Sequence, residues 1–134
     1  MCQNDFELDR PMKFALAACA ALFASQAIAQ DIPSLVTDVA MCPLIAAGED
    51  VQEMGMVLNA EGMFEIEYYC EFSEPLDIYW HEERTITRTG FCAEPGLISP
   101  TVFAIQMSDY EPGVVYVWQQ GLDEATVFNA CWEG

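Results

Sequence analysis

Positive charge is almost absent from this sequence. Its 134 residues include four Lys and Arg side chains and one histidine against 22 acidic side chains, for a formal net charge of −18 at pH 7. Proteins that bind nucleic acid or an anionic membrane surface obtain most of that affinity from Lys and Arg side chains that neutralise phosphates. The composition therefore argues against nucleic acid as a partner. A partner selected by charge must be cationic, although high negative charge also serves solubility alone.

The sequence also lacks an apolar run long enough to cross a membrane. The run Phe14–Ala24 is well short of the ~20 residues that a spanning helix needs. A lysine precedes it, and Ala27-Ile28-Ala29 supplies the small residues required at a signal-peptidase site. We therefore expect residues 12–29 to be a signal peptide. Residues 1–11, which are net acidic, are interpreted as an upstream extension, and residues 30–134 as a single exported domain, periplasmic or extracellular.

A lipid anchor is the disfavoured alternative to simple cleavage. Leu16-Ala17-Ala18-Cys19 has the shape of a lipoprotein box, in which the cysteine would be acylated and become the new N-terminus. Only Phe14 and Ala15 separate this box from Lys13, whereas the apolar region of an export signal spans about seven residues or more. We therefore expect no anchor at Cys19.

The number of cysteines is consistent with an exported protein. Cys2 and Cys19 precede residue 30, and an even set remains in the expected domain: Cys42, Cys70, Cys92 and Cys131. Two disulfides are the expected state in an oxidising compartment. No two of the four form a C-x-x-C pair and the chain has a single histidine, so we expect no metal and no cofactor. Three pairings are possible. We favour Cys42–Cys70 with Cys92–Cys131, which avoids crossed loops.

The remaining sequence indicates a mainly β fold. Leu35, Val36, Val39 and Ala40 recur at helical spacing, which predicts one short N-terminal helix that ends at Pro43. After Gly48 the period changes to two, most clearly in Met63–Glu71, where Cys70 would point inward. The expected strands are Met54–Leu58, Met63–Glu71, Leu76–His81, Thr85–Phe91, Thr101–Ser108, Val114–Gln119 and Ala125–Trp132. About seven short strands favour a small antiparallel β-sandwich or barrel with two disulfides.

The densest group of functional side chains is Tyr79-Trp80-His81-Glu82-Glu83-Arg84, which holds the only histidine. A zinc-protease motif would need a second histidine four residues after His81, and Thr85 stands there. The serines lie in no recognisable nucleophile context. We therefore predict no catalytic residue. The candidate binding residues are Tyr79, His81, Arg84 and Arg88.

Arg84 and Arg88 are the only cations of residues 30–134, which contain 19 acidic side chains. On a strand they would share one face, with Ile86 between them. Two interpretations are open for them. Neighbouring carboxylates hold them in place, or they remain free to meet an anionic group on a ligand or partner.

The aromatic residues suggest a further surface. Tyr69 and Tyr79 are expected to face outward, and with Tyr110 and Tyr116, which lie near a turn, they could form a contact patch. Trp80, Trp118 and Trp132 are expected in the core. The acidic pairs lack the alternating Asp and Asn pattern of an EF-hand, so a calcium site is disfavoured.

Together these observations favour binding over catalysis. The leading hypothesis is a small acidic exported interaction module for a cationic protein or peptide. One alternative is a small hydrolytic or metal-assisted enzyme that uses His81 and nearby carboxylates. The other is an envelope-structure subunit. Oligomeric state is left open.

Overall fold

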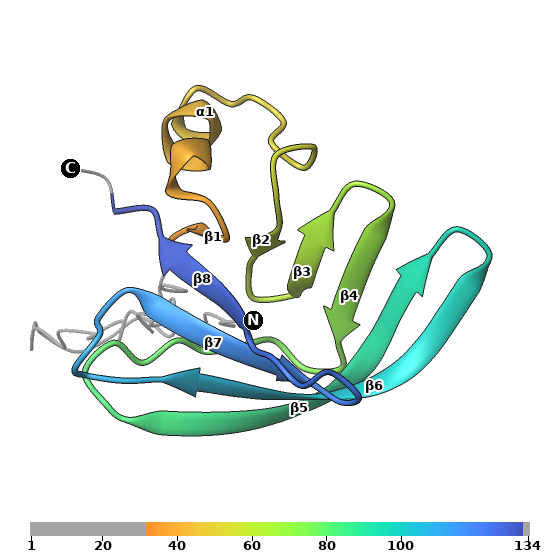
Figure 1. Cartoon of the computed structure of the whole chain (residues 1–134). Helices are drawn as coiled ribbons and strands as arrows, with labels where there is room; N and C mark the ends of the chain where they lie inside the picture. The colour runs from red at the N-terminus through yellow and green to blue at the C-terminus, as the bar shows by residue number, and fades with distance from the viewer. Residues whose placement is uncertain (1–31, 133–134) are drawn as a thin grey trace, which may run out of the picture.

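Eight strands follow one another along the chain, and each pairs with the next in antiparallel fashion. The computed structural model describes residues 32–132 (Figure 1). The strands are β1 (Leu35–Val36), β2 (Val57–Leu58), β3 (Gly62–Glu65), β4 (Tyr68–Phe72), β5 (Arg84–Glu94), β6 (Leu97–Met107), β7 (Val114–Gln119) and β8 (Thr126–Ala130). β8 also pairs with β1, through Ala130 and Leu35, and so closes the ring. The prediction of a mainly β antiparallel domain is confirmed, with the barrel as its form. The expected signal peptide, the N-terminal extension and Cys19 lie outside the described residues.

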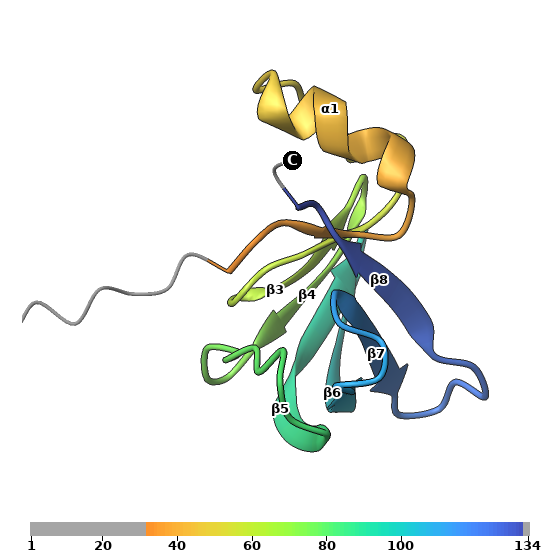
Figure 2. The same cartoon turned by 90° about the vertical axis from the view of Figure 1, so that its left-hand side faces the viewer.

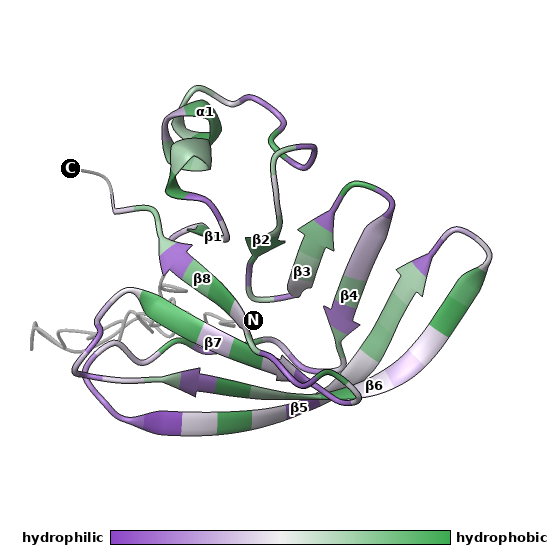
Figure 3. Ribbon diagram, in the orientation of Figure 1, coloured by the Kyte–Doolittle hydropathy of each residue, from purple (hydrophilic) through white to green (hydrophobic). Residues whose placement is uncertain are grey.

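The inside of the barrel is a hydrophobic core to which every strand contributes. Figure 3 shows hydrophobic residues spread along β5, β6 and β7. Burial alternates along the second half of β6, as expected where one face of a strand is buried. The inward set includes Leu35, Leu58, Met63, Cys70, Cys92, Phe103, Ile105, Met107, Val115, Val117 and Phe128. An eight-stranded barrel is just narrow enough for side chains to fill it. These residues are almost fully excluded from solvent, so the interior is packed.

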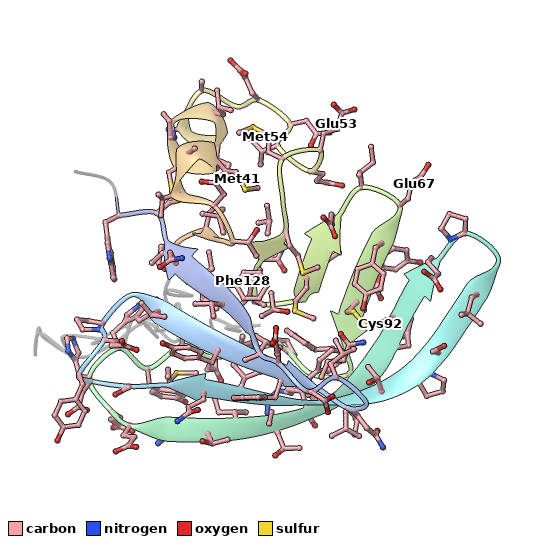
Figure 4. The ribbon with its side chains drawn as sticks, viewed as in Figure 1. Met41, Glu53, Met54, Glu67, Cys92 and Phe128 are labelled. Atoms are coloured by element: carbon pink, nitrogen blue, oxygen red, sulfur yellow. A yellow bond between two sulfur atoms is a disulfide. The ribbon has the colours of Figure 1, made fainter. Side chains whose placement is uncertain are left out.

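A second, smaller core lies outside the barrel, over β1 and β2. The connection between these strands contains a 3-10 turn, η1 (Val39–Met41), and the helix α1 (Cys42–Ala46), which sit at one end of the molecule in Figures 1 and 2. Val36, Met41 and Val51 form this core, and Figure 4 shows Met41 beneath the helix. Since successive side chains of a strand face opposite ways, β1 contributes Leu35 to the barrel and Val36 to this second core.

The prediction of one short N-terminal helix is confirmed, but the helical segment begins later than expected, at Val39. Leu35 and Val36 belong to β1, and Pro43 lies in the first turn of α1 instead of ending a helix. Proline suits this position because its missing N–H would have had no helical partner there. The apparent helical spacing was misleading because Leu35 and Val36 enter two different cores, whereas Val39 and Ala40 are exposed.

The predicted strand Met63–Glu71 is a hairpin. β3 and β4 pair with Met63 opposite Cys70 and Glu65 opposite Tyr68, and the chain reverses at Ile66 and Glu67. Glu67 takes the positive φ of 58° that a tight turn needs, without the glycine or asparagine that normally marks one. The turn reverses the inward and outward assignment of the first half. Met63 is buried with Cys70, whereas the sequence pattern had placed Phe64 there.

Other expected elements also differ. Leu76–His81 is not a strand, although Leu76 is buried and Trp80 packs against the core. Trp118 and Trp132 are 42% and 58% exposed, so the expectation that they are core residues is wrong. Trp132 instead lies edge-on to Trp80, with 5.3 Å between ring centroids.

Both disulfides form, but not in the favoured pairing. The bonds are Cys42–Cys131 and Cys70–Cys92. Cys70 and Cys92 are direct partners in the β4–β5 register. Pairing of β1 with β8 brings the two ends of the domain together, which places Cys42 beside Cys131. The favoured pairing failed because closure of a barrel makes the chain ends neighbours.

Candidate functional site

Arg84 is held by its own neighbours where β5 begins. Its guanidinium lies 4.0 Å from the centroid of the Tyr79 ring and donates a hydrogen bond of 2.8 Å to the Glu82 carboxylate. This is an ion pair, as the first interpretation of the arginines requires. His81 is exposed in the connection between β4 and β5. Three of the predicted binding residues thus lie near one end of the barrel.

Arg88 lies four residues after Arg84 on β5. Because side chains alternate along a strand, it shares a face with Arg84 and Ile86. It stands opposite Phe103 of β6. Its guanidinium donates to the carbonyl oxygens of Pro75, at 3.1 Å, and Thr87, at 3.2 Å. Its Nε is buried without a partner in the described part of the chain. The bond to Pro75 links Arg88 to the β4–β5 connection.

Tyr69 and Tyr79 do not gather into one patch. Tyr69 stands opposite Ala93, near the far end of β5, and packs edge-on against Phe91 with 6.2 Å between ring centroids. Tyr79 lies beside Arg84, at the other end of the same strand. Tyr116 donates a hydrogen bond of 2.8 Å to Glu111, and this bond, then burial and the charge of Glu111, raises the Tyr116 pKa above 10.0.

A concavity lies elsewhere, between the β3–β4 and β5–β6 hairpins. β4 and β5 pair as far as Tyr69 and Ala93, and beyond that point the two hairpins diverge toward their tips (Figure 1). The groove between them has a volume of about 770 Å³ and is lined by both hairpins and by Gln52. This size is within the range of about 300–1,000 Å³ that is usual for binding pockets. We call it the hairpin groove.

One part of the hairpin groove is apolar. Leu97 and Ile98, at the start of β6, are 53% and 68% exposed, and both line the groove. Phe64 and Tyr69 line it from the β3–β4 side. Single exposed apolar residues are ordinary on protein surfaces, but contiguous ones often mark a contact site.

The other part of the hairpin groove is acidic. Its lining includes four glutamates and no Lys, Arg or His: Glu65, Glu67, Glu71 and Glu94. Figure 4 shows Glu67 at the tip of the β3–β4 hairpin. Arg84 begins β5 while Glu94 ends it, so that cation is separated from the groove by the length of the strand. The groove therefore combines apolar surface with uncompensated negative charge.

A smaller cavity opens at the mouth of the barrel and shares part of its wall with the hairpin groove. Its volume is about 160 Å³, and Tyr68, Glu94 and Leu97 line both spaces. Tyr68 donates a hydrogen bond of 3.1 Å to the Gln119 side-chain oxygen, and the Gln119 amide nitrogen lies 3.4 Å from Cys92 Sγ. Figure 4 shows Cys92 at this position. A polar layer thus separates the mouth from the core.

Sequence reasoning missed this groove. Treating Met63–Glu71 as one strand concealed the turn that forms its first wall. The second wall did leave a signal, because Pro95-Gly96 is a turn dipeptide followed directly by the apolar pair Leu97-Ile98. Within residues 32–132, no group of three or more His, Cys, Asp or Glu side chains is placed to hold a metal ion. In the same part of the chain, no helix has the length and apolar character to span a membrane.

Comparison with protein-family models, with curated proteins and with solved structures gave no match. No function therefore carries over from a relative, and the groove is interpreted from its own residues.

Proposed function

We propose that this protein is an exported binding module that captures a cationic protein or peptide in the hairpin groove. The observation that carries the proposal is the composition of the groove wall. Exposed Leu97 and Ile98 lie next to four glutamates, with no basic side chain among them. A partner that buries its own apolar residues there while placing Lys or Arg against the carboxylates matches both properties.

The two parts of the groove have different roles in this proposal. Contact with the apolar residues supplies affinity by removing apolar area from water. The carboxylates in the lining steer a cationic partner toward the groove and reject acidic ones, an effect that weakens as salt screens the charges. Export is part of the proposal because disulfides persist mainly in oxidising compartments, and the two in this domain join segments far apart in the sequence.

The test uses a short labelled peptide in which Lys and Leu alternate, with a Glu and Leu peptide as comparator. We expect the cationic peptide to bind, and its Kd to rise at least several-fold between about 0.05 M and 0.5 M salt as the Debye length shrinks. The acidic peptide should not bind. Equal binding of both peptides, or affinity that is unchanged by salt, would exclude capture by charge.

Matched variants locate the site. Glu67→Gln with Glu94→Gln removes two charges from the groove, and Glu74→Gln with Asp77→Asn removes two from the exposed β4–β5 connection. Each exposed pair is worth about 0.2–1 kcal/mol, so the groove variant should lose severalfold affinity and the control should change little. If both variants lose affinity equally, only the net charge matters and the groove is not the site.

A further inference from the structure

We propose that the cavity at the barrel mouth is a pocket for one Lys or Arg side chain of the bound partner. This inference rests on the proposed function, since the side chain would enter from the hairpin groove. The cavity and the hairpin groove are adjacent, because Glu94 and Leu97 line both spaces. A peptide lying in the groove is therefore next to the opening.

The lining of the cavity matches a long cationic side chain along its length. Ala93 and Leu97 offer apolar contact to the methylene stem, which Lys and Arg readily pack against apolar surface. The Glu94 carboxylate supplies the opposite charge. The lining contains no Lys, Arg or His to repel the incoming cation.

Further oxygens line the cavity. The Gln119 side-chain oxygen accepts from Tyr68 at 3.1 Å and retains a second lone pair, and the Ser99 hydroxyl can also accept a hydrogen bond. An ammonium or guanidinium group carries donors and no acceptor, so it is the complement of this set. The Gln119 amide, 3.4 Å from Cys92 Sγ, is oriented by the disulfide.

Size and ligand count argue against two other occupants, a drug-sized molecule and a calcium ion. A volume of about 160 Å³ is well below the roughly 300–1,000 Å³ of a pocket for a drug-sized molecule. Calcium takes about six to eight oxygen ligands, usually including several carboxylates, whereas Glu94 is the single carboxylate in this lining. One side chain of the partner fits both the size and the lining.

The experiment titrates the full domain with n-butylammonium and n-butylguanidinium, and with uncharged n-butylurea as comparator, at millimolar concentrations. Side-chain amide signals in ¹H–¹⁵N NMR spectra report on Gln119. We expect saturable shifts of the Gln119 amide with one or both cations and none with the urea. The two cations separate a Lys pocket from an Arg pocket. Shifts that are equal for all three probes would overturn the proposal.

Two variants separate this pocket from the groove. Glu94→Gln should weaken binding of the cationic probe severalfold, and Glu71→Gln, which lines the groove but not the small cavity, should leave it unchanged. If the Lys and Leu peptide binds in a salt-dependent way while the small cations do not shift Gln119, the pocket is wrong and the proposed function stands. If the cations bind and the peptide does not, the proposed function fails and the pocket remains.

Discussion

Cys70 on β4 stands directly opposite Cys92 on β5, and the disulfide between them joins the strands one residue pair before they separate. The last pair is Tyr69 with Ala93, beyond which the hairpin groove opens. The Gln119 amide nitrogen also lies 3.4 Å from Cys92 Sγ. This one bond therefore sets the spacing of the two hairpins and one wall of the barrel mouth.

The two disulfides should differ in what they stabilise. In the chain-entropy description a disulfide restricts the unfolded chain, and more so for longer loops. The separations are 22 residues for Cys70–Cys92 and 89 for Cys42–Cys131, which correspond to about 3 and about 4.5 kcal/mol. We expect urea unfolding to show a larger loss for Cys42→Ala with Cys131→Ala than for Cys70→Ala with Cys92→Ala.

The effect of the two disulfides on peptide affinity should have the opposite order to their effect on stability. The Cys70 and Cys92 variant loosens the hairpins that form the groove, whereas Cys42–Cys131 ties the helix region to the chain end outside it. Affinity for the Lys and Leu peptide should therefore fall in the first variant and persist in the second. Equal affinity in both variants would contradict a role for the Cys70–Cys92 bond in shaping the groove.

Backbone crowding at Gly90 gives a second prediction. A Cβ at this position would overlap the carbonyl oxygen of Glu71 on the neighbouring strand, and backbone atoms in a paired sheet cannot move away cheaply. We expect Gly90→Ala to lower the free energy of unfolding by more than about 3 kcal/mol, which is above the usual range of about 0.5–3 kcal/mol for a single substitution.

Gly96 is the matched control for this substitution. It has a positive φ of 81°, but a Cβ there meets nothing within 4 Å. Gly96→Ala should therefore cost only the conformational strain of about 1–2 kcal/mol. Chemical denaturation of the two variants compares them directly, and an equal loss in both would mean that the crowding at Gly90 relaxes.

The sequence predicted the parts of this fold that local periodicity controls. Val114–Gln119 was predicted with the bounds that β7 has, and β5 was predicted within its true range because its residues alternate between core and solvent. Local pattern could not locate the Ile66-Glu67 turn, because alternation continues on both sides of it and neither residue is a usual turn former.

The site depended on tertiary relations that no local pattern contains. Arg84, Tyr79 and Glu82 are close in sequence and do meet, whereas Phe64 and Ile98 come together only because two separate hairpins border the same groove. The disulfide pairing failed for the same reason, since it depends on β1 closing against β8. The acidic balance of the whole sequence is shared by the lining of the groove.

The two arginines give a third prediction. Arg84 makes an exposed ion pair with Glu82, which is worth about 0–1 kcal/mol. Arg88 donates to the Pro75 carbonyl and so holds the β4–β5 connection against the barrel, and hydrogen bonds from charged groups are worth about 1.5–3 kcal/mol. Thermal and urea unfolding should therefore show a larger loss of stability for Arg88→Gln than for Arg84→Gln. The reverse order would contradict the anchoring role of Arg88.

The last prediction concerns the Tyr116 hydroxyl, which donates a hydrogen bond of 2.8 Å to Glu111. This bond, with burial and the Glu111 charge as smaller causes, raises the Tyr116 pKa above 10.0. A pKa that is higher in the folded state means that the native protein holds the proton more tightly than the unfolded chain. The resulting stabilisation is complete below the unfolded pKa of about 10 and is lost as the pH rises through the native pKa.

Glu111→Ala removes the acceptor and the charge together, so we expect it to lower the Tyr116 pKa toward 10.0. Near-ultraviolet tyrosinate absorbance, followed with pH and corrected with Tyr116→Phe, isolates this group from the other four tyrosines. Asp109→Asn is the control, because it removes a nearby charge and leaves the hydrogen bond intact. The stability difference between wild type and Glu111→Ala should shrink above the native pKa, where a tyrosinate can no longer donate. A difference that grows with pH in that range would show that the hydroxyl is not the donor to Glu111.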